Sequence, residues 1–353
     1  MFERSRAETG PPTGGAGRPR GIERELLARP FRPHPLLRNG HAQTLAAWAW
    51  PGRARPEETR GDETRLFEVE PGVRLLARCR WQEDRAARPT VVLVHGLGGS
   101  ADAPYVLGAA RLAYDGVAGA NVVRLNQRNC GGTEGLTPTL YHSGMSGDLA
   151  AVVGELAREG LGRILVAGFS MGGNLALKMA GEMGEGAPPA LLGVCAVSPA
   201  LDLAATVRTL EKPANRLYEQ AFTRGLRRLV ARKKGLFPDL YDTVDLARAR
   251  TIRDFDELYT APYGGFDGAN DYYERASAIR AAGRIRVPTL VIHAADDPLV
   301  PAAPLQNPKL RENPHISLAV TPRGGHVAFV SASRGERFWA EHRLAGFLQL
   351  LSG

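Results

Sequence analysis

Residues 164–174, Ile-Leu-Val-Ala-Gly-Phe-Ser-Met-Gly-Gly-Asn, decide how the rest of this chain is interpreted. The apolar first half predicts a buried strand, and the run from Leu175 to Ala180 predicts a helix after it. Between them lies Gly-x-Ser170-x-Gly, whose glycines allow a sharp turn that lifts the serine hydroxyl out of a sheet. The turn also aims the N–H of Met171 at negative charge that forms beside the serine. We therefore predict a nucleophilic serine at this turn.

Further strands and helices on both sides of this stretch indicate the fold class. Apolar runs predict strands, and helical patterns separate several of them. The predicted strands cover residues 90–94, 121–126, 191–197, 288–293 and 316–321, and a predicted hairpin covers 64–70 and 73–81. The alternation predicts an α/β protein with a mostly parallel twisted sheet flanked by helices.

Three regions differ in composition from this pattern. Residues 1–20 are a Gly/Pro/Arg mixture that cannot bury apolar surface, so we expect a disordered tail ahead of a domain at 21–353. Residues 31–50 are rich in aromatic side chains and predict an extended segment that wraps the domain. Residues 203–280, approximately, lack the strand and helix alternation and predict a helical cap inserted into the sheet domain.

One predicted helix of the cap is strongly basic. Its apolar positions are Leu217, Ala221, Leu226, Leu229 and Val230, and the positions between them include Arg224, Arg227, Arg228, Arg232, Lys233 and Lys234. We interpret the basic positions as a solvated face, with peripheral contact to an anionic membrane surface as the alternative.

Composition and charge exclude several classes of function. The net charge of +8 comes from scattered arginines without interleaved aromatic residues, so we expect no nucleic-acid partner. The three cysteines are too few and too scattered for a disulfide framework or a Cys-x-x-Cys metal site. No apolar stretch is long enough for a signal peptide or a membrane span, so we expect a cytoplasmic protein. Nothing in the sequence indicates a metal or an organic cofactor.

A glycine-rich loop follows the predicted strand at residues 90–94. It reads His-Gly-Leu-Gly-Gly-Ser over residues 95–100 and precedes the serine strand, where a second amide can reach the oxyanion of an acyl-transfer reaction. We assign that role to the N–H of Leu97, and a structural role in the turn to His95. A phosphate-binding loop is the alternative, but the chain has no Gly-Lys-Ser/Thr and no Gly-x-Gly-x-x-Gly.

A histidine and an acid downstream complete a candidate catalytic triad. His326 lies in a Gly-Gly-His loop after the last predicted strand, and Asp297 lies on the turn after the strand before it. The chain order Ser170, Asp297, His326 is one that triad enzymes use. Two other acids stay open, because Asp296 adjoins Asp297 and Asp202 follows an earlier strand. The Asp-Pro-x-x-Pro turn favours Asp297 as the acid and assigns Asp296 to fixing the turn.

Motifs spread along the chain point to a family. They are Asn-Gly-His-x-Gln-Thr at 39–44, His-Gly-Leu-Gly-Gly at 95–99, Arg-Asn-Cys-Gly-Gly at 128–132, Gly-Phe-Ser-Met-Gly-Gly-Asn at 168–174, Phe-Asp-x-x-Tyr-Thr-Ala-Pro at 255–262, Asp-Tyr-Tyr at 271–273, Asp-Asp-Pro at 296–298 and Gly-Gly-His at 324–326. On these motifs the chain resembles the YheT-like subfamily of α/β-hydrolases. That subfamily includes the yeast medium-chain fatty acid ethyl ester synthase/esterases and the mammalian membrane-anchored ABHD lipases. The resemblance covers nearly all of the chain after about Phe31.

The resemblance implies an α/β-hydrolase fold and places the family's triad on Ser170, Asp297 and His326. It implies a carboxylic ester hydrolase (EC 3.1.1) that cleaves small-molecule esters of medium or longer acyl chains through an acyl-enzyme on the serine. The sequence departs from the family in having Asn129 where glycine is usual, and we expect no N-terminal membrane helix like that of the ABHD lipases. Acyl transfer to an alcohol by the same triad is one alternative. A non-catalytic ligand-binding protein is another, although it would not need the strained serine turn.

Overall fold

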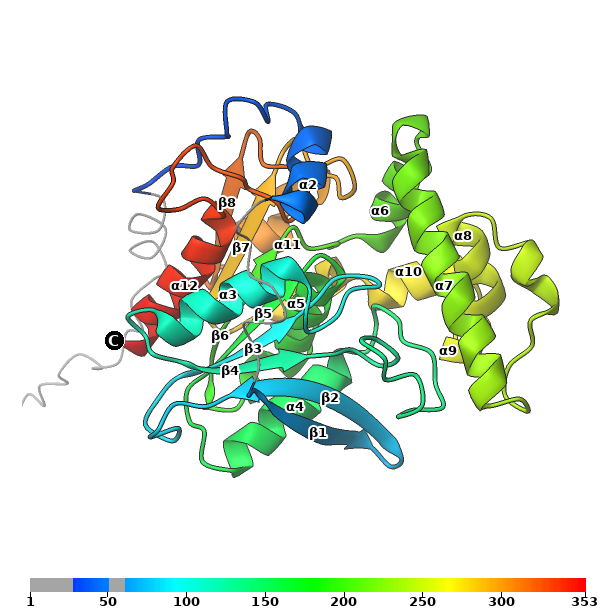
Figure 1. Cartoon of the computed structure of the whole chain (residues 1–353), viewed down its shortest axis with the longest axis horizontal. Helices are drawn as coiled ribbons and strands as arrows, with labels where there is room; N and C mark the ends of the chain where they lie inside the picture. Colours follow the sequence, from blue (N-terminus) through cyan, green and yellow to red (C-terminus); the bar gives the residue numbers. More distant parts are fainter. Residues whose placement is uncertain (1–27, 51–60) are drawn as a thin grey trace, which may run out of the picture.

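This computed structural model describes residues 28–50 and 61–353. The described residues contain a sheet of eight strands (Figure 1). The strand order is β1-β2-β4-β3-β5-β6-β7-β8. β1 and β2 form the predicted hairpin, β2 pairs antiparallel with β4, and the strands from β3 to β8 pair in parallel. The strands are β1 Glu63–Glu70, β2 Val73–Arg80, β3 Thr90–Val94, β4 Asn121–Leu125, β5 Ile164–Phe169, β6 Leu191–Val197, β7 Thr289–Ala294 and β8 Ile316–Thr321. The mostly parallel α/β sheet predicted from the sequence is therefore confirmed.

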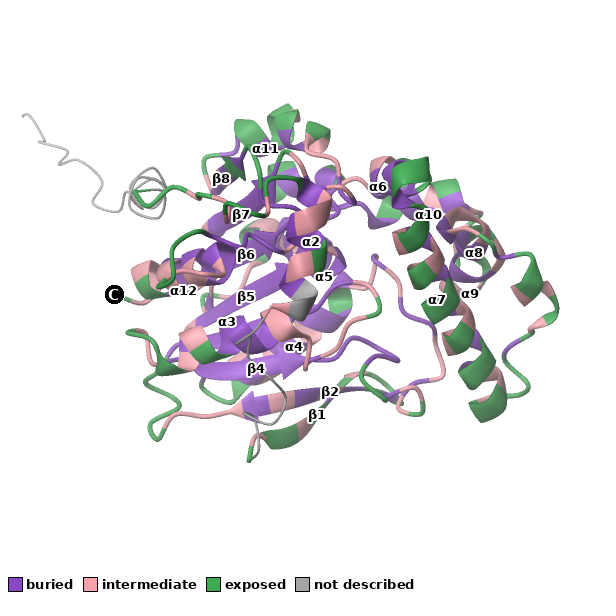
Figure 2. Ribbon diagram, turned by 45° about the horizontal axis from the view of Figure 1, so that its top comes forward, coloured by how far each residue is buried: buried purple, intermediate pink, exposed green. Residues whose placement is uncertain are grey.

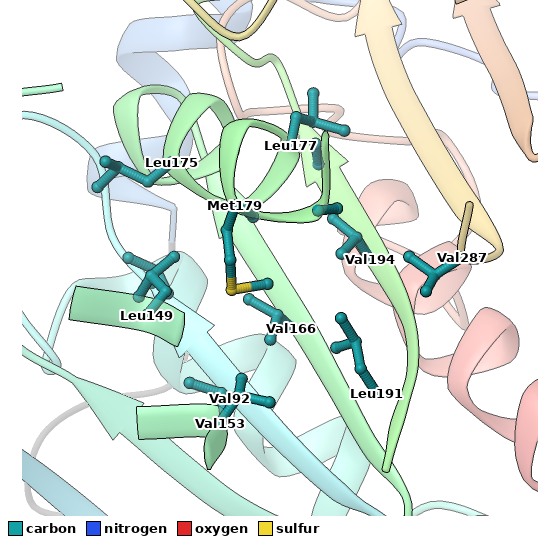
Figure 3. Close-up of a cluster of buried hydrophobic side chains, with 14 of the residues drawn as sticks. Val92, Leu149, Val153, Val166, Leu175, Leu177, Met179, Leu191, Val194 and Val287 are labelled. Carbon is teal, nitrogen blue, oxygen red and sulfur yellow. The ribbon is translucent and has the colours of Figure 1, made fainter. Parts of the chain in front are cut away.

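Helices cover both faces of this sheet, because strand side chains alternate between two apolar layers. The central strands β3 and β5 are buried along their whole length (Figure 2). Val92 and Val166 pack with α4 and α5 on one face, and Figure 3 shows part of this cluster. Leu93 and Leu165 pack with α3 and α12 on the other face. These helices are α3 Pro104–Asp115, α4 Ser146–Arg158, α5 Met171–Met183 and α12 Trp339–Ser352.

The segment between β6 and β7 is helical and lies to one side of the sheet (Figure 1). We call residues 203–276 the cap. Its elements are α6 Leu203–Leu210, η3 Pro213–Asn215, α7 Arg216–Leu236, η4 Val244–Ala247, α8 Ile252–Phe255, the short π-helix η5 Asp256–Thr260, α9 Ala261–Gly264 and α10 Ala269–Ala276. Short helices outside the cap are η2 Gly184–Gly186, η6 Ala278–Arg280, η7 Ala282–Arg284, η8 Ala303–Gln306 and α11 Pro308–Arg311.

The buried face of α7 differs from the predicted one. Leu226 and Val230 are buried as predicted, but Leu217 is 78% exposed. The buried stripe runs instead through the polar residues Glu219 and Thr223. The prediction was wrong at the start of this helix because its contact face is partly polar, and hydrophobic spacing cannot locate such a face.

Lys233, predicted on the solvated basic face of α7, is buried. Its ammonium group donates hydrogen bonds to the carbonyl oxygens of Glu134 (2.9 Å) and Thr137. It also lies over the ring of Phe237, 4.2 Å from the ring centroid. The lysine therefore ties the cap to the loop that follows β4, whereas the neighbouring Arg228 and Arg232 are exposed.

The second half of the segment predicted to be extended, residues 31–50, is helical instead. Residues Gly40–Ala49 form α2, and the side chain of Asn39 caps this helix by accepting a hydrogen bond from the N–H of Ala42 at 2.8 Å. The predicted tail at residues 1–20 lies outside the described residues. Among the described helices, none has the length and apolar character that crossing a bilayer requires.

Candidate active site

Ser170 occupies a strained turn between β5 and α5. Its φ is +54° and its ψ is −117°, a conformation that residues other than glycine rarely adopt. The turn depends on close backbone packing at the two neighbouring glycines. A Cβ on Gly168 would lie 2.1 Å from the carbonyl oxygen of Gly172, and one on Gly172 would lie 2.4 Å from that of Val94. The predicted serine turn is thus built from positions where only glycine fits.

Ser170, His326 and Asp297 are brought together from the loops that follow β5, β8 and β7. The Nε2 atom of His326 lies 3.0 Å from the Oγ atom of Ser170. Its Nδ1 atom lies 2.8 Å from the Oδ2 atom of Asp297. This network assigns the proton of the neutral ring to Nδ1, which donates to Asp297, so that Nε2 can accept from the serine hydroxyl.

The surroundings of Asp297 keep its carboxylate ionised and fixed. Its side chain is fully buried, and its Oδ1 atom accepts hydrogen bonds from the N–H groups of Leu299 (2.9 Å) and Val300 (3.0 Å). Burial alone would raise the pKa of Asp297, but the charge and hydrogen bond of His326 outweigh it, with help from His293 and the N–H of Val300. The pKa of this carboxyl therefore lies below its usual value.

The two alternative acids have other partners. Asp296 accepts a hydrogen bond from the N–H of Gly325 at 2.9 Å, which links the turn after β7 to the loop that carries His326. Asp202 accepts a hydrogen bond from the N–H of Ala205 at 2.8 Å and caps α6. Of the three candidate acids, the structure therefore places Asp297 against the histidine.

The glycine-rich loop after β3, which includes Leu97, passes close to the serine turn. A Cβ on Gly96 would lie 3.1 Å from the Cβ of Ser170, so the loop passes directly over the turn. The amides on either side of Leu97 are engaged, because Gly96 donates to the hydroxyl of Tyr105 and Gly98 to that of Tyr141, each at 3.0 Å.

The amides of Leu97 and Met171 are left available at this site. Within the described residues, neither N–H has a hydrogen-bond acceptor. Met171 is the first residue of α5, so its amide also lies at the positive end of the helix dipole. The two predicted oxyanion donors are therefore unoccupied amides on the two segments that meet at Ser170.

His95 supports this loop from inside the protein, as predicted. The residue is fully buried, its Nδ1 donates to the carbonyl oxygen of Gly96 at 2.7 Å, and its Nε2 accepts from the N–H of Gln127 at 3.2 Å. Burial lowers the pKa of His95 to about 4, so the ring is neutral at pH 7.

Helix α2 holds the loop that carries His326, a role that the sequence reading missed. The N–H of His326 donates to the hydroxyl of Thr44 at 2.9 Å, and that hydroxyl donates to the carbonyl oxygen of Gly40 at 2.7 Å. Gln43 adds a bond from the N–H of Val330 at 2.7 Å. The signal was present in the Asn-Gly-His-x-Gln-Thr motif, but nothing in the local sequence says that residues so far upstream meet the histidine loop.

A pocket opens beside Ser170 and His326 under the cap. Most of its walls are apolar, with Leu203, Val207 and Leu210 from α6 and Phe222 and Leu226 from α7 among the lining residues. Its empty volume is about 740 Å³, counting the part open to solvent. A predominantly apolar pocket beside Ser170 suits a flexible hydrocarbon chain.

His142 also lines this pocket. The N–H of Gly144 donates a hydrogen bond to Nδ1 of His142 at 3.1 Å. Burial, aided by the charges of Arg128 and other cations, lowers the pKa of His142 to about 4. His142 therefore borders the pocket as a neutral ring.

Comparisons with known proteins agree with this fold. A family model described as the alpha/beta hydrolase fold matches residues 89–333, and the chain therefore belongs to the α/β-hydrolase family. The predicted resemblance to YheT-like proteins is confirmed: the putative esterase YheT of Escherichia coli (strain K12) is 32% identical over 275 residues, covering 76% of this chain and 79% of that protein.

Two further comparisons, one with a relative in sequence and one with a solved structure, support different conclusions. Phospholipase ABHD3 of Mus musculus is 32% identical over 249 residues, which cover 70% of this chain and 60% of that protein. The structure of an esterase from Pyrococcus furiosus aligns with a TM-score of 0.56 at 22% identity, covering 86% of this chain and 96% of that one. The structural neighbour shows a shared fold, and the sequence relatives place the chain among proteins named as esterases and lipases.

Proposed function

We propose that this protein hydrolyses carboxylic esters through an acyl-enzyme on Ser170. The observation that carries the proposal is the continuous hydrogen-bonded path from the Ser170 hydroxyl through His326 to the buried carboxylate of Asp297. The family and the esterase and lipase names of its relatives support ester hydrolysis in general. Cleavage through this particular serine is our inference from the geometry.

In the first half of the reaction, the Oγ atom of Ser170 attacks the ester carbonyl carbon. His326 takes the hydroxyl proton on Nε2, and Asp297 stabilises the imidazolium that forms. The amides of Leu97 and Met171 donate to the oxyanion of the tetrahedral intermediate. The intermediate collapses, His326 gives its proton to the leaving alkoxide, and the acyl group stays on the serine.

In the second half, water replaces the alcohol. His326 takes a proton from the water as the water attacks the acyl carbonyl, the same two amides hold the second oxyanion, and the proton returns to Ser170 as the carboxylic acid leaves. The residues named here supply the general base, the nucleophile and the oxyanion donors.

The pocket supports a substrate with an apolar acyl chain of medium or greater length. Leu203, Val207 and Leu210 form a wall along which methylene groups can lie, and burying each methylene contributes about 0.8 kcal/mol. Relatives are named as a phospholipase, a monoacylglycerol lipase and a medium-chain fatty acid ethyl ester synthase/esterase, all of which act on acyl esters by name. We therefore place the acyl chain in this pocket.

The test is hydrolysis of a p-nitrophenyl ester series, from acetyl to palmitoyl, by the wild type and Ser170→Ala. We expect nitrophenol release that depends on Ser170 and peaks at one chain length. Adding an alcohol in a second run separates hydrolysis from acyl transfer, because transfer yields a new ester. Equal rates for wild type and Ser170→Ala would contradict the proposal, as would failure of a fluorophosphonate to label Ser170 together with no turnover.

A further inference from the structure

The pocket at Ser170 is lined by two kinds of side chain. Most of the residues that α6 and α7 contribute are apolar, with Thr206 as the exception. The lining also includes four polar or aromatic residues, Asp256 and Thr260 from η5 and Tyr272 and Tyr273 from α10. A plain hydrocarbon chain has no hydrogen-bond donor to offer a carboxyl group. The presence of Asp256 among the lining residues therefore needs an explanation.

Asp256 is the acidic residue among these lining residues, and each of its two carboxylate oxygens accepts a hydrogen bond. The hydroxyl of Thr260 donates to Oδ1 at 2.7 Å, and the hydroxyl of Tyr273 donates to Oδ2 at 2.8 Å. The residue is 6% exposed and lines the pocket that Ser170 lines. A carboxylate can accept about four hydrogen bonds, and these two donors leave acceptor capacity on each oxygen.

An acyl chain without a hydrogen-bond donor would interact poorly with this carboxylate. Burial already raises the pKa of Asp256 to about 6, against the hydrogen bonds of Thr260 and Tyr273 and the charge of Arg253. Methylene groups packed against it would remove its remaining hydration without supplying a donor, which costs free energy. A donor on the substrate would instead replace the lost water.

We propose that Asp256 accepts a hydrogen bond from a hydroxyl group on the acyl chain, so that the preferred substrates are hydroxyacyl esters. This inference rests on the proposed function, which places the acyl chain in this pocket. A neutral hydroxyl fits better than an ammonium group, because the positive charge of Arg253 already acts on Asp256 and the described residues that line the pocket include no second acid. Asp256 is thus a specificity-determining residue and takes no part in the bond cleavage.

A purely structural role is the competing explanation. Asp256 joins η5 to α10 through Tyr273, and η5 is a π-helix, a form that occurs at functional sites but must also be stabilised locally. A structural role predicts that loss of the carboxylate lowers stability and slows all substrates alike. A recognition role predicts a change in the ratio of rates on hydroxylated and plain chains.

The experiment compares p-nitrophenyl esters of the chain length that the wild type cleaves fastest, with no hydroxyl or with one hydroxyl at successive carbons from C3 outward. We expect the wild type to prefer one hydroxylated ester by tenfold or more in kcat/KM, since sites that hydrogen-bond a substrate hydroxyl discriminate strongly against its absence. In Asp256→Asn the preference should fall to about threefold or less. Tyr273→Phe is the matched control, because it breaks the same Asp256–Tyr273 bond but keeps the carboxylate, and it should retain the preference.

Each outcome decides the question. If the wild type cleaves the plain ester as fast as every hydroxylated one, and does so through Ser170, the recognition role is wrong while the proposed function stands. If Asp256→Asn and Tyr273→Phe slow all esters by the same factor, the role is structural. If Asp256→Asn does not fold, two measurements still test the recognition role. They are the preference of the wild type for a hydroxylated ester and the ratio of kcat/KM on hydroxylated and plain esters in Tyr273→Phe. Absence of both turnover and Ser170 labelling would overturn the proposed function and this inference together.

Discussion

Asp297 and His326 lie on the turns after the neighbouring parallel strands β7 and β8, and the contact between Oδ2 and Nδ1 is 2.8 Å. Two backbone amides hold the other carboxylate oxygen, so Asp297 cannot rotate without losing them. The pairing of two adjacent strand ends thus fixes the Asp297 carboxylate relative to the His326 ring.

Replacing this carboxylate should remove activity while leaving the fold. In Asp297→Asn, an amide oxygen can still accept from Leu299 and Val300, but the amide cannot stabilise the imidazolium and favours the wrong tautomer. We expect kcat to fall by about 10³-fold to 10⁴-fold with little change in Tm. Asp202→Asn is the control and should stay within twofold of the wild type, because asparagine caps a helix equally well. A larger loss in Asp202→Asn than in Asp297→Asn would show that the acid was assigned wrongly.

The serine turn should tolerate no side chain at Gly172. An alanine Cβ there would lie 2.4 Å from the carbonyl oxygen of Val94, so the strand or the helix must move. We expect Gly172→Ala to lower the free energy of unfolding by about 3 kcal/mol, measured by urea titration. Gly154→Ala, on α4 with nothing within 4 Å of its Cβ, should instead stabilise by up to about 1 kcal/mol. Equal effects at both positions would contradict this reading of the turn.

The contact between α2 and the histidine loop should matter for catalysis. Thr44→Val leaves the N–H of His326 without its acceptor, and the ring loses part of its positioning. We expect kcat to fall about tenfold with a smaller change in KM. Thr44→Ser keeps the hydroxyl and should restore most of the rate. A valine variant with unchanged kcat would mean that the loop holds the ring without help from α2.

The buried Lys233 should stabilise the cap. Lys233→Met retains the aliphatic stem but leaves the carbonyl oxygens of Glu134 and Thr137 without their donor. We expect a loss of about 2 kcal/mol in the free energy of unfolding. Lys234→Met, at the next and more exposed position, should cost less than about 0.5 kcal/mol. If both variants lose the same amount, the buried contacts of Lys233 contribute nothing specific.

Stability should fall as the pH is lowered through the range that separates the folded and unfolded pKa values of His95. The folded pKa is about 4, whereas an unperturbed histidine has a pKa of about 6.5, so the unfolded chain binds more protons between these values. The destabilisation is absent above pH 6.5 and grows as the pH falls toward 4. From pH 7 to pH 5 we expect His95 to account for about 2 kcal/mol of lost unfolding free energy. Urea titrations of wild type and His95→Gln should show the smaller pH dependence in the variant, and equal slopes would rule this source out.

The sequence was most informative where local chemistry sets the structure. The strands, the hairpin and the serine turn follow from apolar runs and from glycines that nothing else can replace. His326 and Asp297 could be placed on their loops because each follows a strand, and parallel strands end at a common edge. The sequence alone could not decide which of the three acids contacts His326. Asp296 and Asp297 are adjacent on one turn, and only the structure shows which side chain points to the histidine ring.

Long-range contacts account for what the sequence reading missed. Helix α2 was predicted as an extended segment, although Asn39 and Gly40 mark a capped helix start, and its contact with His326 spans most of the chain. The buried stripe of α7 includes Glu219 and Lys233, and the partners of Lys233 are the distant backbone carbonyl oxygens of Glu134 and Thr137. No local pattern of hydrophobicity reports such partners.

Trapping the acyl-enzyme tests the central claim most directly. Wild-type protein is mixed with a p-nitrophenyl ester, quenched with acid within the first turnovers and weighed as an intact chain, followed by peptide mapping. We predict a mass increase equal to the acyl group less one hydrogen, located on the peptide that contains Ser170 and absent from Ser170→Ala. Full turnover without any adduct, or an adduct and undiminished rate in Ser170→Ala, would contradict the account.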